Sequence, residues 1–341
     1  MPKYCVYEGE ECRLDKALGD ILPELGLRGR RRMIENNSVL VHGIARKAAF
    51  VVRAGAVITL LEQPANTAQP QPGSAHAGSG TGLPATLPES LSGSARALER
   101  QGDFIFFCKP AAMHSVHLAG STETNLETLL PSLAASLLQA STAQPEDLHL
   151  VQRLDYGTSG IVAAAAKPLA ALHWRDMEDR GLCCKRYLAL VCGALGTDIT
   201  ATAELDMAKR RQTKVLSSQA PALRHTHFTP LAQLLPQEYA PLCALAYPQG
   251  VAPAASSLSL VGCTIHKGAR HQIRAHAAAS GFPLWGDALY GGGEGIFFLH
   301  HGALDSPLCS VRLAPAWLDL LPLPFARIAE QWLMQKEHTQ P

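Results

Sequence analysis

The chain has 341 residues, of which 47% are hydrophobic and 17% charged, a composition that suits a soluble protein of about two domains with a sizeable core. No apolar run reaches the roughly 18 residues needed to span a bilayer. The first eleven residues carry acids rather than a basic stretch leading into an apolar one, so we expect a cytoplasmic protein without a membrane segment. The net charge of +1 excludes an overall basic nucleic-acid binder, so any RNA contact must come from local patches.

Residues 1–62 read as a small α/β module. Leu14, Leu18, Ile21 and Leu22 recur at helical spacing, a second helix is expected around Met33 and Ile34, and short strands are expected at 39–41 and 57–61. Between residues 28 and 53 a single acid, Glu35, stands against seven bases: Arg28, Arg30, Arg31, Arg32, Arg46, Lys47 and Arg53. Such a cluster suits phosphate contacts, and a helix with merely solvated arginines is the alternative.

Residues 63–95 read as a flexible linker. This segment consists mainly of Pro, Ala, Gly, Ser and Thr. It cannot bury enough apolar area to offset the entropy lost on ordering, so we expect it to separate two domains.

Residues 96–335 read as a second, larger domain of α+β class. Short apolar strands alternate with a few helices, which is typical of a sheet with helices packed on it. We expect strands at 104–108, 161–166, 187–191 and 258–264, and helices at 126–138 (interrupted at Pro131), 168–180 and 272–280.

The turn before the 161–166 strand is the strongest candidate site. Asp155 lies there between Arg153 and the glycines Gly157 and Gly160. A strand that enters the core fixes the backbone behind the turn, so a carboxylate at this place can be aimed at a ligand. An Arg-x-Asp turn is also a common structural ion pair, and the residues alone favour that interpretation.

Three motifs in order resemble the RluA-type pseudouridine synthases. They are Arg-Leu-Asp with Thr-Ser-Gly at 153–160, Lys-Arg-Tyr at 185–187, and His-Gln-Ile-Arg at 271–274 followed by Gly-Asp at 286–287 and Tyr290. The similarity extends to Lys109-Pro110 and Leu299-His300. It implies a pseudouridine synthase fold, in which a mixed, mainly antiparallel central sheet is flanked by helices.

The resemblance implies a role for each matching residue. Asp155 would be the catalyst, Tyr187 the partner on the base side, and Arg274 the ion-pair partner that keeps Asp155 ionised. Arg153 would fill the space left by a flipped uridine. Further substrate contacts are implied for Thr158, Lys185, His271 and Gln272. Without the resemblance, Tyr187 reads as a buried strand aromatic and Arg274 as a surface arginine at the start of a helix.

The first module resembles an S4 RNA-binding domain. Arg13 to Leu18 is similar to its opening, and Val39 to Gly43 to its turn, although His42 stands where Asn is common. S4 modules commonly precede this synthase domain. The resemblance therefore implies RNA contacts from Arg30, Arg31, Arg32, Arg46 and Lys47.

Two departures bear on activity. Gln152 replaces the usual His before Arg153, and Ala269 replaces the usual Arg of the third motif. Because Asp155, Tyr187 and Arg274 are all present, we predict an active enzyme that isomerises uridines in structured RNA. Ribosomal RNA is the first choice of substrate and transfer RNA the second. A factor of the same fold that binds RNA without catalysis is the alternative, and a glycosidase-like hydrolase lacks a second carboxylate near the motif.

We expect no cofactor and no metal. His266, His271 and His276 follow one another at five-residue steps, which do not share one helical face. Nine cysteines without a Cys-x-x-Cys pair indicate reduced thiols. We expect a monomer whose only partner is RNA.

Overall fold

The computed structural model describes residues 3–23, 25–35, 38–42, 44–60, 93–118, 121–138, 147–208, 212–247, 252 and 255–336. The linker predicted at 63–95 lies outside this range except for its last three residues. The domain boundaries therefore stay predictions.

The N-terminal module combines two helices with two small antiparallel sheets. Leu14, Leu18, Val39 and Ile58 are fully buried in its own core, which explains the helical spacing in the sequence. One sheet has the order β1-β6-β3-β4 and the other pairs β2 with β5. The elements are β1 (Lys3–Val6), β2 (Cys12–Arg13), α1 (Leu14–Ile21), α2 (Leu27–Glu35), β3 (Val39–Val41), β4 (Ile44–Ala45), β5 (Val51–Val52) and β6 (Val57–Leu60).

The second domain is built on a large mixed sheet with the order β12-β15-β16-β11-β17-β10-β8-β7, to which β18 and β9 attach beside β17 and β10. A separate hairpin pairs β13 with β14. The strands are β7 (Arg96–Gln101), β8 (Phe104–Lys109), β9 (His149–Leu150), β10 (Ser159–Ala165), β11 (Cys184–Cys192), β12 (Ile199–Ala201), β13 (Ala203–Asp206), β14 (Lys214–Gln219), β15 (Thr226–Leu234), β16 (Leu258–Ile265), β17 (Leu299–Ser306) and β18 (Cys309–Arg312).

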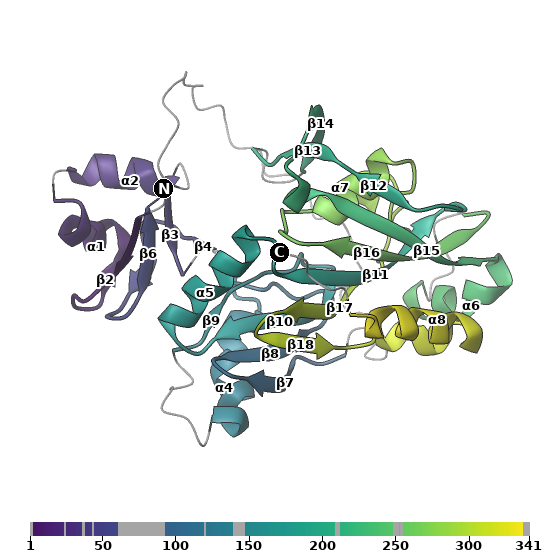
Figure 1. Ribbon diagram of the computed structural model, residues 1–341, viewed down its shortest axis with the longest axis horizontal. Helices are drawn as coiled ribbons and strands as arrows, with labels where there is room; N and C mark the ends of the chain where they lie inside the picture. The colour runs from purple at the N-terminus through teal and green to yellow at the C-terminus, as the bar shows by residue number, and fades with distance from the viewer. Residues whose placement is uncertain are drawn as a thin grey trace.

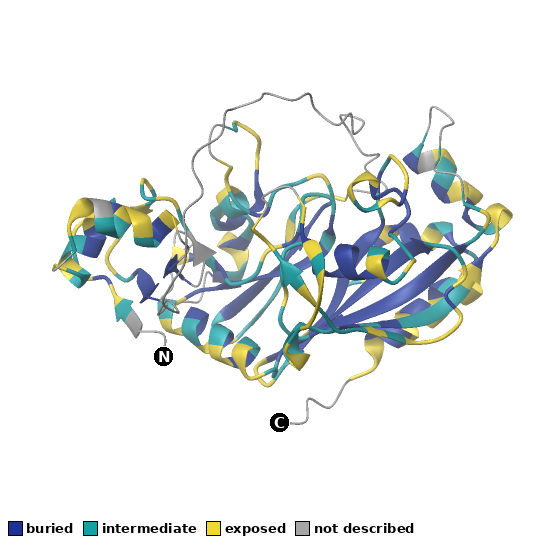
Figure 2. Ribbon diagram, turned by 90° about the horizontal axis from the view of Figure 1, so that it is seen from above, coloured by how far each residue is buried: buried dark blue, intermediate teal, exposed yellow. Residues whose placement is uncertain are grey.

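Helices cover both faces of this sheet, so its strands are buried on both sides (Figures 1 and 2). On β8, Ile105 and Phe107 face one core cluster with α4 and α7, whereas Phe104 and Phe106 face another with α5. Helices α6 and α8 pack on a third cluster beside β11 and β16. The helices are α4 (Leu126–Leu138), α5 (Pro168–Asp179), α6 (Pro236–Ala246), α7 (Gln272–Ala279) and α8 (Leu323–Met334), with short 3-10 turns at Ala222–Arg224, Ala288–Tyr290 and Ala316–Leu320.

The parallel pairing of β10 with β17 makes the sheet mixed, since the other pairings found among the described strands are antiparallel. Gly160 aligns with His301 there. Its φ is +117°, and a Cβ at this position would lie 2.3 Å from the carbonyl oxygen of His301. Only glycine fits this close approach of β10 to β17. The contact positions β10 directly behind the turn that carries Asp155.

Most of the expected elements are confirmed within one or two residues at each end. The expected interruption at Pro131 is wrong, because α4 runs through it from Leu126 to Leu138. Leu126, Leu130, Ala134 and Leu138 form a buried stripe along the helix, and their packing outweighs the missing backbone N–H of the proline. Among the helices described, none is long and apolar enough to cross a membrane.

Candidate active site

Asp155 sits in a short turn between β9 and β10, on the sheet face covered by α4 and α7. The backbone N–H of Thr158 donates to the Asp155 carbonyl at 3.1 Å and closes the turn. Before it, the Ser115 hydroxyl donates to the Leu154 carbonyl at 2.9 Å and accepts from the Leu154 N–H at 3.0 Å. The backbone on both sides of Asp155 is therefore fixed, while its side chain keeps 21% of its surface exposed.

Arg274 joins Asp155 to a second carboxylate. Its Nη1 lies 3.3 Å from Asp155 Oδ2, and its Nε and Nη2 donate to Asp287 at 2.6 and 2.8 Å. The guanidinium also lies 4.5 Å from the centre of the Phe297 ring and 5.2 Å from that of Tyr290. Although burial lowers the pKa of Arg274, its hydrogen bonds and the charge of Asp287 raise it above its ordinary value. A permanent cation thus faces the partly exposed Asp155 carboxylate.

His271 approaches Asp155 from the start of α7. It adopts a left-handed backbone conformation with φ 54°, and its Nε2 lies 3.9 Å from Asp155 Oδ1. Its Nδ1 is 3.1 Å from the Tyr290 hydroxyl. Burial lowers the pKa of His271 more than the charge of Asp155 raises it, so the ring is neutral at neutral pH.

Tyr187 projects from β11 on the same face. Its ring stacks on the His301 ring with centroids 4.5 Å apart and planes 17° apart, and it keeps 6% of its surface exposed. Burial, and next the charge of Asp155, raise the pKa of Tyr187 above its ordinary value. The hydroxyl is therefore protonated at neutral pH and can donate a hydrogen bond, and the Asp155 charge contributes to this shift.

Lys109 is a buried lysine beneath this turn that the sequence indicated only as part of a resemblance. Its Nζ donates to the carbonyls of Pro110 at 2.8 Å, Met113 at 2.7 Å and, more weakly, Tyr156 at 3.4 Å. Burial lowers the pKa of Lys109 to about 7, and the charge of Asp155 opposes the shift. The signal available in the sequence was a lysine that ends an apolar strand directly before a proline.

Asp287 was also absent from the predicted site, although the Gly286-Asp287 motif was noted. Its side chain is 1% exposed, and its Oδ1 also accepts the backbone N–H of Leu289 at 3.2 Å. A carboxylate that is buried to this degree needs charged partners, and Arg274 supplies them.

Three of the predicted substrate contacts are buried, and two of them bind protein groups. The Lys185 ammonium pairs with Glu178. The Gln272 amide donates to the carbonyls of Arg224 and His225 and to the Thr226 hydroxyl. Thr158 is 2% exposed. An RNA contact needs accessible polar atoms, and these three side chains are 2–3% exposed, so their roles in substrate binding stay predictions. Arg153, by contrast, is exposed.

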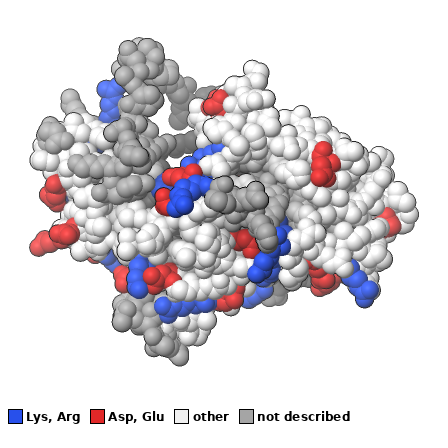
Figure 3. Space-filling view, in the orientation of Figure 1, with Lys and Arg blue, Asp and Glu red and all other residues white. Residues whose placement is uncertain are grey.

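The bases of the N-terminal module also differ in their surroundings. Arg31 is half exposed and donates to the buried Asp15 at 2.8 Å. Arg46 forms an ion pair with Glu127 of α4 and keeps only 14% of its side chain exposed. Arg32 and Lys47 are exposed, and Arg30 is half-buried. On the face shown in Figure 3, bases and acids are intermingled rather than gathered in one basic field.

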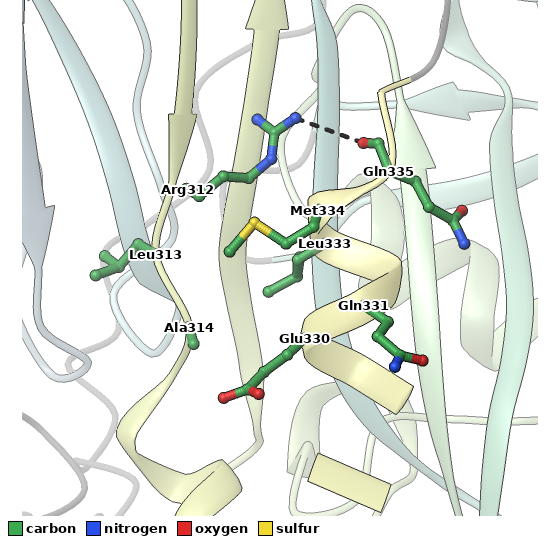
Figure 4. A pocket seen from close by; sticks show the side chains of 8 residues that line it. All are labelled: Arg312, Leu313, Ala314, Glu330, Gln331, Leu333, Met334 and Gln335. Carbon is green, nitrogen blue, oxygen red and sulfur yellow. Dashed lines mark hydrogen bonds between the residues drawn. The ribbon is translucent and has the colours of Figure 1, made fainter. Parts of the chain in front are cut away.

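A separate hollow lies between β18 and α8 (Figure 4). It is lined by Arg312, Leu313, Ala314, Glu330, Gln331, Leu333, Met334 and Gln335. The Arg312 guanidinium is already held by Asp305 at 2.8 and 2.9 Å. None of the residues around Asp155 lines this hollow, so it is not part of the candidate active site.

The three predicted histidines have separate surroundings. His266 Nδ1 lies 3.1 Å from the Cys183 carbonyl, and His276 lies between the Thr226 hydroxyl at 2.8 Å and the Ala203 carbonyl at 2.9 Å. His271 belongs to the Asp155 site.

Comparison with known proteins identifies the family of this chain. A family model described as RNA pseudouridylate synthase matches residues 103–279, a segment that contains Asp155, Tyr187 and Arg274. The chain belongs to the RNA pseudouridylate synthase family. It is therefore an isomerase that acts on uridine in RNA, and its mixed sheet with flanking helices is the pseudouridine synthase fold.

Similar members of this family come from bacteria. An RNA pseudouridine synthase of Chloroflexus aurantiacus is 26% identical over 82% of this chain and 75% of its own length. The ribosomal large subunit pseudouridine synthase D of Nitrosomonas europaea is 25% identical over 82% of this chain and 69% of its own length. Among solved structures, human RNA pseudouridylate synthase domain containing 1 aligns with a TM-score of 0.47 at 19% identity, over 65% of this chain and 83% of that one.

Proposed function

We propose that this synthase converts specific uridines of structured RNA, ribosomal RNA in the first place, to pseudouridine with Asp155 as its catalytic carboxylate. The observation that carries the proposal is the partly exposed Asp155 carboxylate, held by a fixed turn and faced by Arg274 at 3.3 Å. A relative that is named for the large ribosomal subunit supports ribosomal RNA as the substrate.

The reaction breaks the bond between C1′ and N1 of the uridine, rotates the base, and joins C1′ to C5. The C5 proton leaves and N1 gains a proton, so the atoms balance without a co-reactant. An ionised Asp155 near C1′ and C2′ can stabilise positive charge on the sugar, remove a proton, or attack covalently. Arg274 supports each of these routes because it keeps the carboxylate charged and oriented.

Tyr187 suits the base side of this reaction. A flat ring backed by His301 can stack on a flipped uracil, and its protonated hydroxyl can donate a hydrogen bond or relay a proton near the base. Exposed Arg153, two residues before Asp155, is well placed to fill the gap that a flipped uridine leaves in the RNA.

The departures at Gln152 and Ala269 fit an active enzyme. The Gln152 amide donates to the Ile161 carbonyl at 3.4 Å, and the Ala269 N–H donates to Gln272 at 2.9 Å. Each residue thus takes part in a hydrogen bond to or from the backbone near the site, and neither displaces Asp155 or Arg274.

Pseudouridine mapping of ribosomal and transfer RNA from a deletion strain tests the proposal. A site that is lost on deletion should return with the wild type and with the exposed control Asp319→Asn, but not with Asp155→Asn. Return of the site with Asp155→Asn would reject Asp155 as the catalyst. If no site is lost in either RNA, the proposed substrates are wrong, and the alternative of a non-catalytic RNA-binding factor gains support.

A further inference from the structure

The N-terminal module contacts the catalytic domain through two pairs of side chains. The rings of His42 and His149 stack with centroids 3.5 Å apart and planes 14° apart. Beside them, Arg46 Nη2 lies 2.5 Å from Glu127 Oε1. His42 and Arg46 come from the β3–β4 region of the module, whereas Glu127 and His149 come from α4 and β9. Residues far apart in the chain thus form one contact patch.

This patch has the burial of a packed interface. His42 is 6% exposed, and the Arg46 and Glu127 side chains are 14% and 25% exposed. An ion pair at such burial is screened less by solvent than an exposed pair. The Arg46 guanidinium also lies 4.5 Å from the centre of the Phe50 ring in its own module, which limits its freedom.

A second contact fixes the orientation of the module. Strand β6 lies against α5, and the turn at Gly55 reaches Pro168, whose Cγ is 4.0 Å from where a Cβ of residue 55 would stand. Figure 1 shows the module at this end of the large sheet, next to α5. Two separate contacts define a single position of the module, which one contact alone would not.

The docked position brings the bases of the module close to the active-site turn. Glu127, which pairs with Arg46, donates its backbone N–H to the Ser115 carbonyl at 3.1 Å, and the Ser115 hydroxyl bonds to the backbone of Leu154. The docking pair is thus connected to the turn in which Leu154 separates Arg153 from Asp155. Lys47, which follows Arg46 in the chain, is exposed, as is Arg153.

We propose that the pairs His42/His149 and Arg46/Glu127 dock the N-terminal module on the catalytic domain, and that docking joins Lys47 and Arg153 into one binding surface for RNA phosphates beside the target uridine. Arg46 acts in docking rather than in direct RNA contact. The phosphate-binding part rests on the proposed function. The docking part does not, because it concerns the free protein.

Small-angle scattering of the full chain without RNA tests the docking. Arg46→Glu and Glu127→Arg should each place like charges together and increase the radius of gyration and the maximum dimension. The double variant, which restores the pair with opposite polarity, should return both to the wild-type values. Arg53→Glu is the matched control, because Arg53 pairs with Glu11 at 2.8 Å within the module and both side chains are largely exposed. An unchanged radius in Arg46→Glu, or no recovery in the double variant, would overturn the docking.

Affinity for unmodified large-subunit ribosomal RNA, measured by filter binding, tests the shared surface independently of catalysis. His149→Ala removes the stack without changing the net charge at pH 7.5 and should weaken binding about tenfold, with a shallower salt dependence because fewer phosphates are contacted together. His149→Phe keeps an aromatic ring and should bind like the wild type. Equal affinity and salt slope for His149→Ala would overturn the shared surface even where scattering shows undocking. If the wild-type protein binds this RNA as expected but converts no uridine in it, the result would count against the proposed function alone.

Discussion

Asp287 holds Arg274 through two hydrogen bonds of 2.6 and 2.8 Å, whereas Arg274 reaches Asp155 through one of 3.3 Å. The buried carboxylate therefore sets the position of the guanidinium, and the partly exposed carboxylate receives one N–H from its Nη1. This division lets Asp155 keep free lone pairs for a substrate while its charge is stabilised.

Asp287→Asn should lower kcat because Arg274 loses its anchor and no longer aligns with Asp155. We expect a fall of about 10- to 100-fold, the usual effect of removing a group that orients a functional side chain. Breaking a buried ion pair should also cost about 3–5 kcal/mol of unfolding free energy. Steady-state kinetics and urea unfolding measure both quantities, with Asp319→Asn as the surface control. Wild-type kcat in a folded Asp287→Asn protein would show that the anchor is dispensable.

Lys109→Met should destabilise the turn that carries Asp155. The substitution leaves the carbonyls of Pro110 and Met113 without the donor that they share, at a cost of roughly 1–3 kcal/mol for each buried polar group. Lys167→Met is the matched control, because its ammonium is half exposed and pairs with Asp103, so its loss should cost under about 1 kcal/mol. Urea unfolding compares the two variants. Equal stability of the two would mean that the ammonium of Lys109 contributes nothing to the fold.

The apolar strands could be predicted from the sequence because burial on both faces leaves a continuous apolar run. Phe104 to Cys108 and Ile161 to Ala166 are such runs, and both lie inside the large sheet. The residues of strands β12, β13 and β14 are exposed or only half-buried, so they carry no comparable signal. Strand β9 has two residues and becomes a strand only by pairing with β10.

The pairing of Asp155 with Arg274 was predictable only through the motifs, because 119 residues separate the two. No periodicity encodes a contact at that distance in the chain. Burial, similarly, cannot be read from residue type. In the sequence, Lys185 and Arg46 have the signal of RNA-binding cations, whereas in the structure they pair with Glu178 and Glu127. Both pairs depend on how α5, α4 and the N-terminal module pack.

Tyr187→Phe should separate the two roles of the tyrosine. The phenylalanine ring keeps the stack on His301, so RNA affinity and KM should change less than threefold. Loss of the hydroxyl should lower kcat by about 100-fold or more, the usual contribution of a positioned proton donor or acceptor. Tyr187→Ala, which also removes the ring, should raise KM in addition. A Tyr187→Phe enzyme with the kcat of the wild type would limit the residue to stacking.

Docking of the N-terminal module should weaken as the pH falls. Burial lowers the pKa of His42 to about 2 and that of His149 to about 4, with Arg46 lowering both, and with Asp147 and Glu127 opposing the shift at His149. In the undocked chain each ring should titrate near the usual value of about 6.5. Between the docked and the undocked pKa values, the docked form therefore binds fewer protons than the undocked form. The contribution of the two rings to docking stability is fully present above about pH 6.5 and is lost progressively as the pH falls toward 4.

Small-angle scattering at pH 7.5, 6 and 5 should accordingly show a radius of gyration that grows as the pH decreases. His149→Phe removes one of the two titrating rings and keeps the stack, so its radius should depend less on pH. The Arg46/Glu127 pair is intact in this variant, which separates protonation of the histidines from loss of the ion pair. A wild-type radius that stays constant from pH 7.5 to 5 would mean that the two rings do not titrate on undocking. The same pH dependence in His149→Phe would assign the effect to His42 or to another group at the interface.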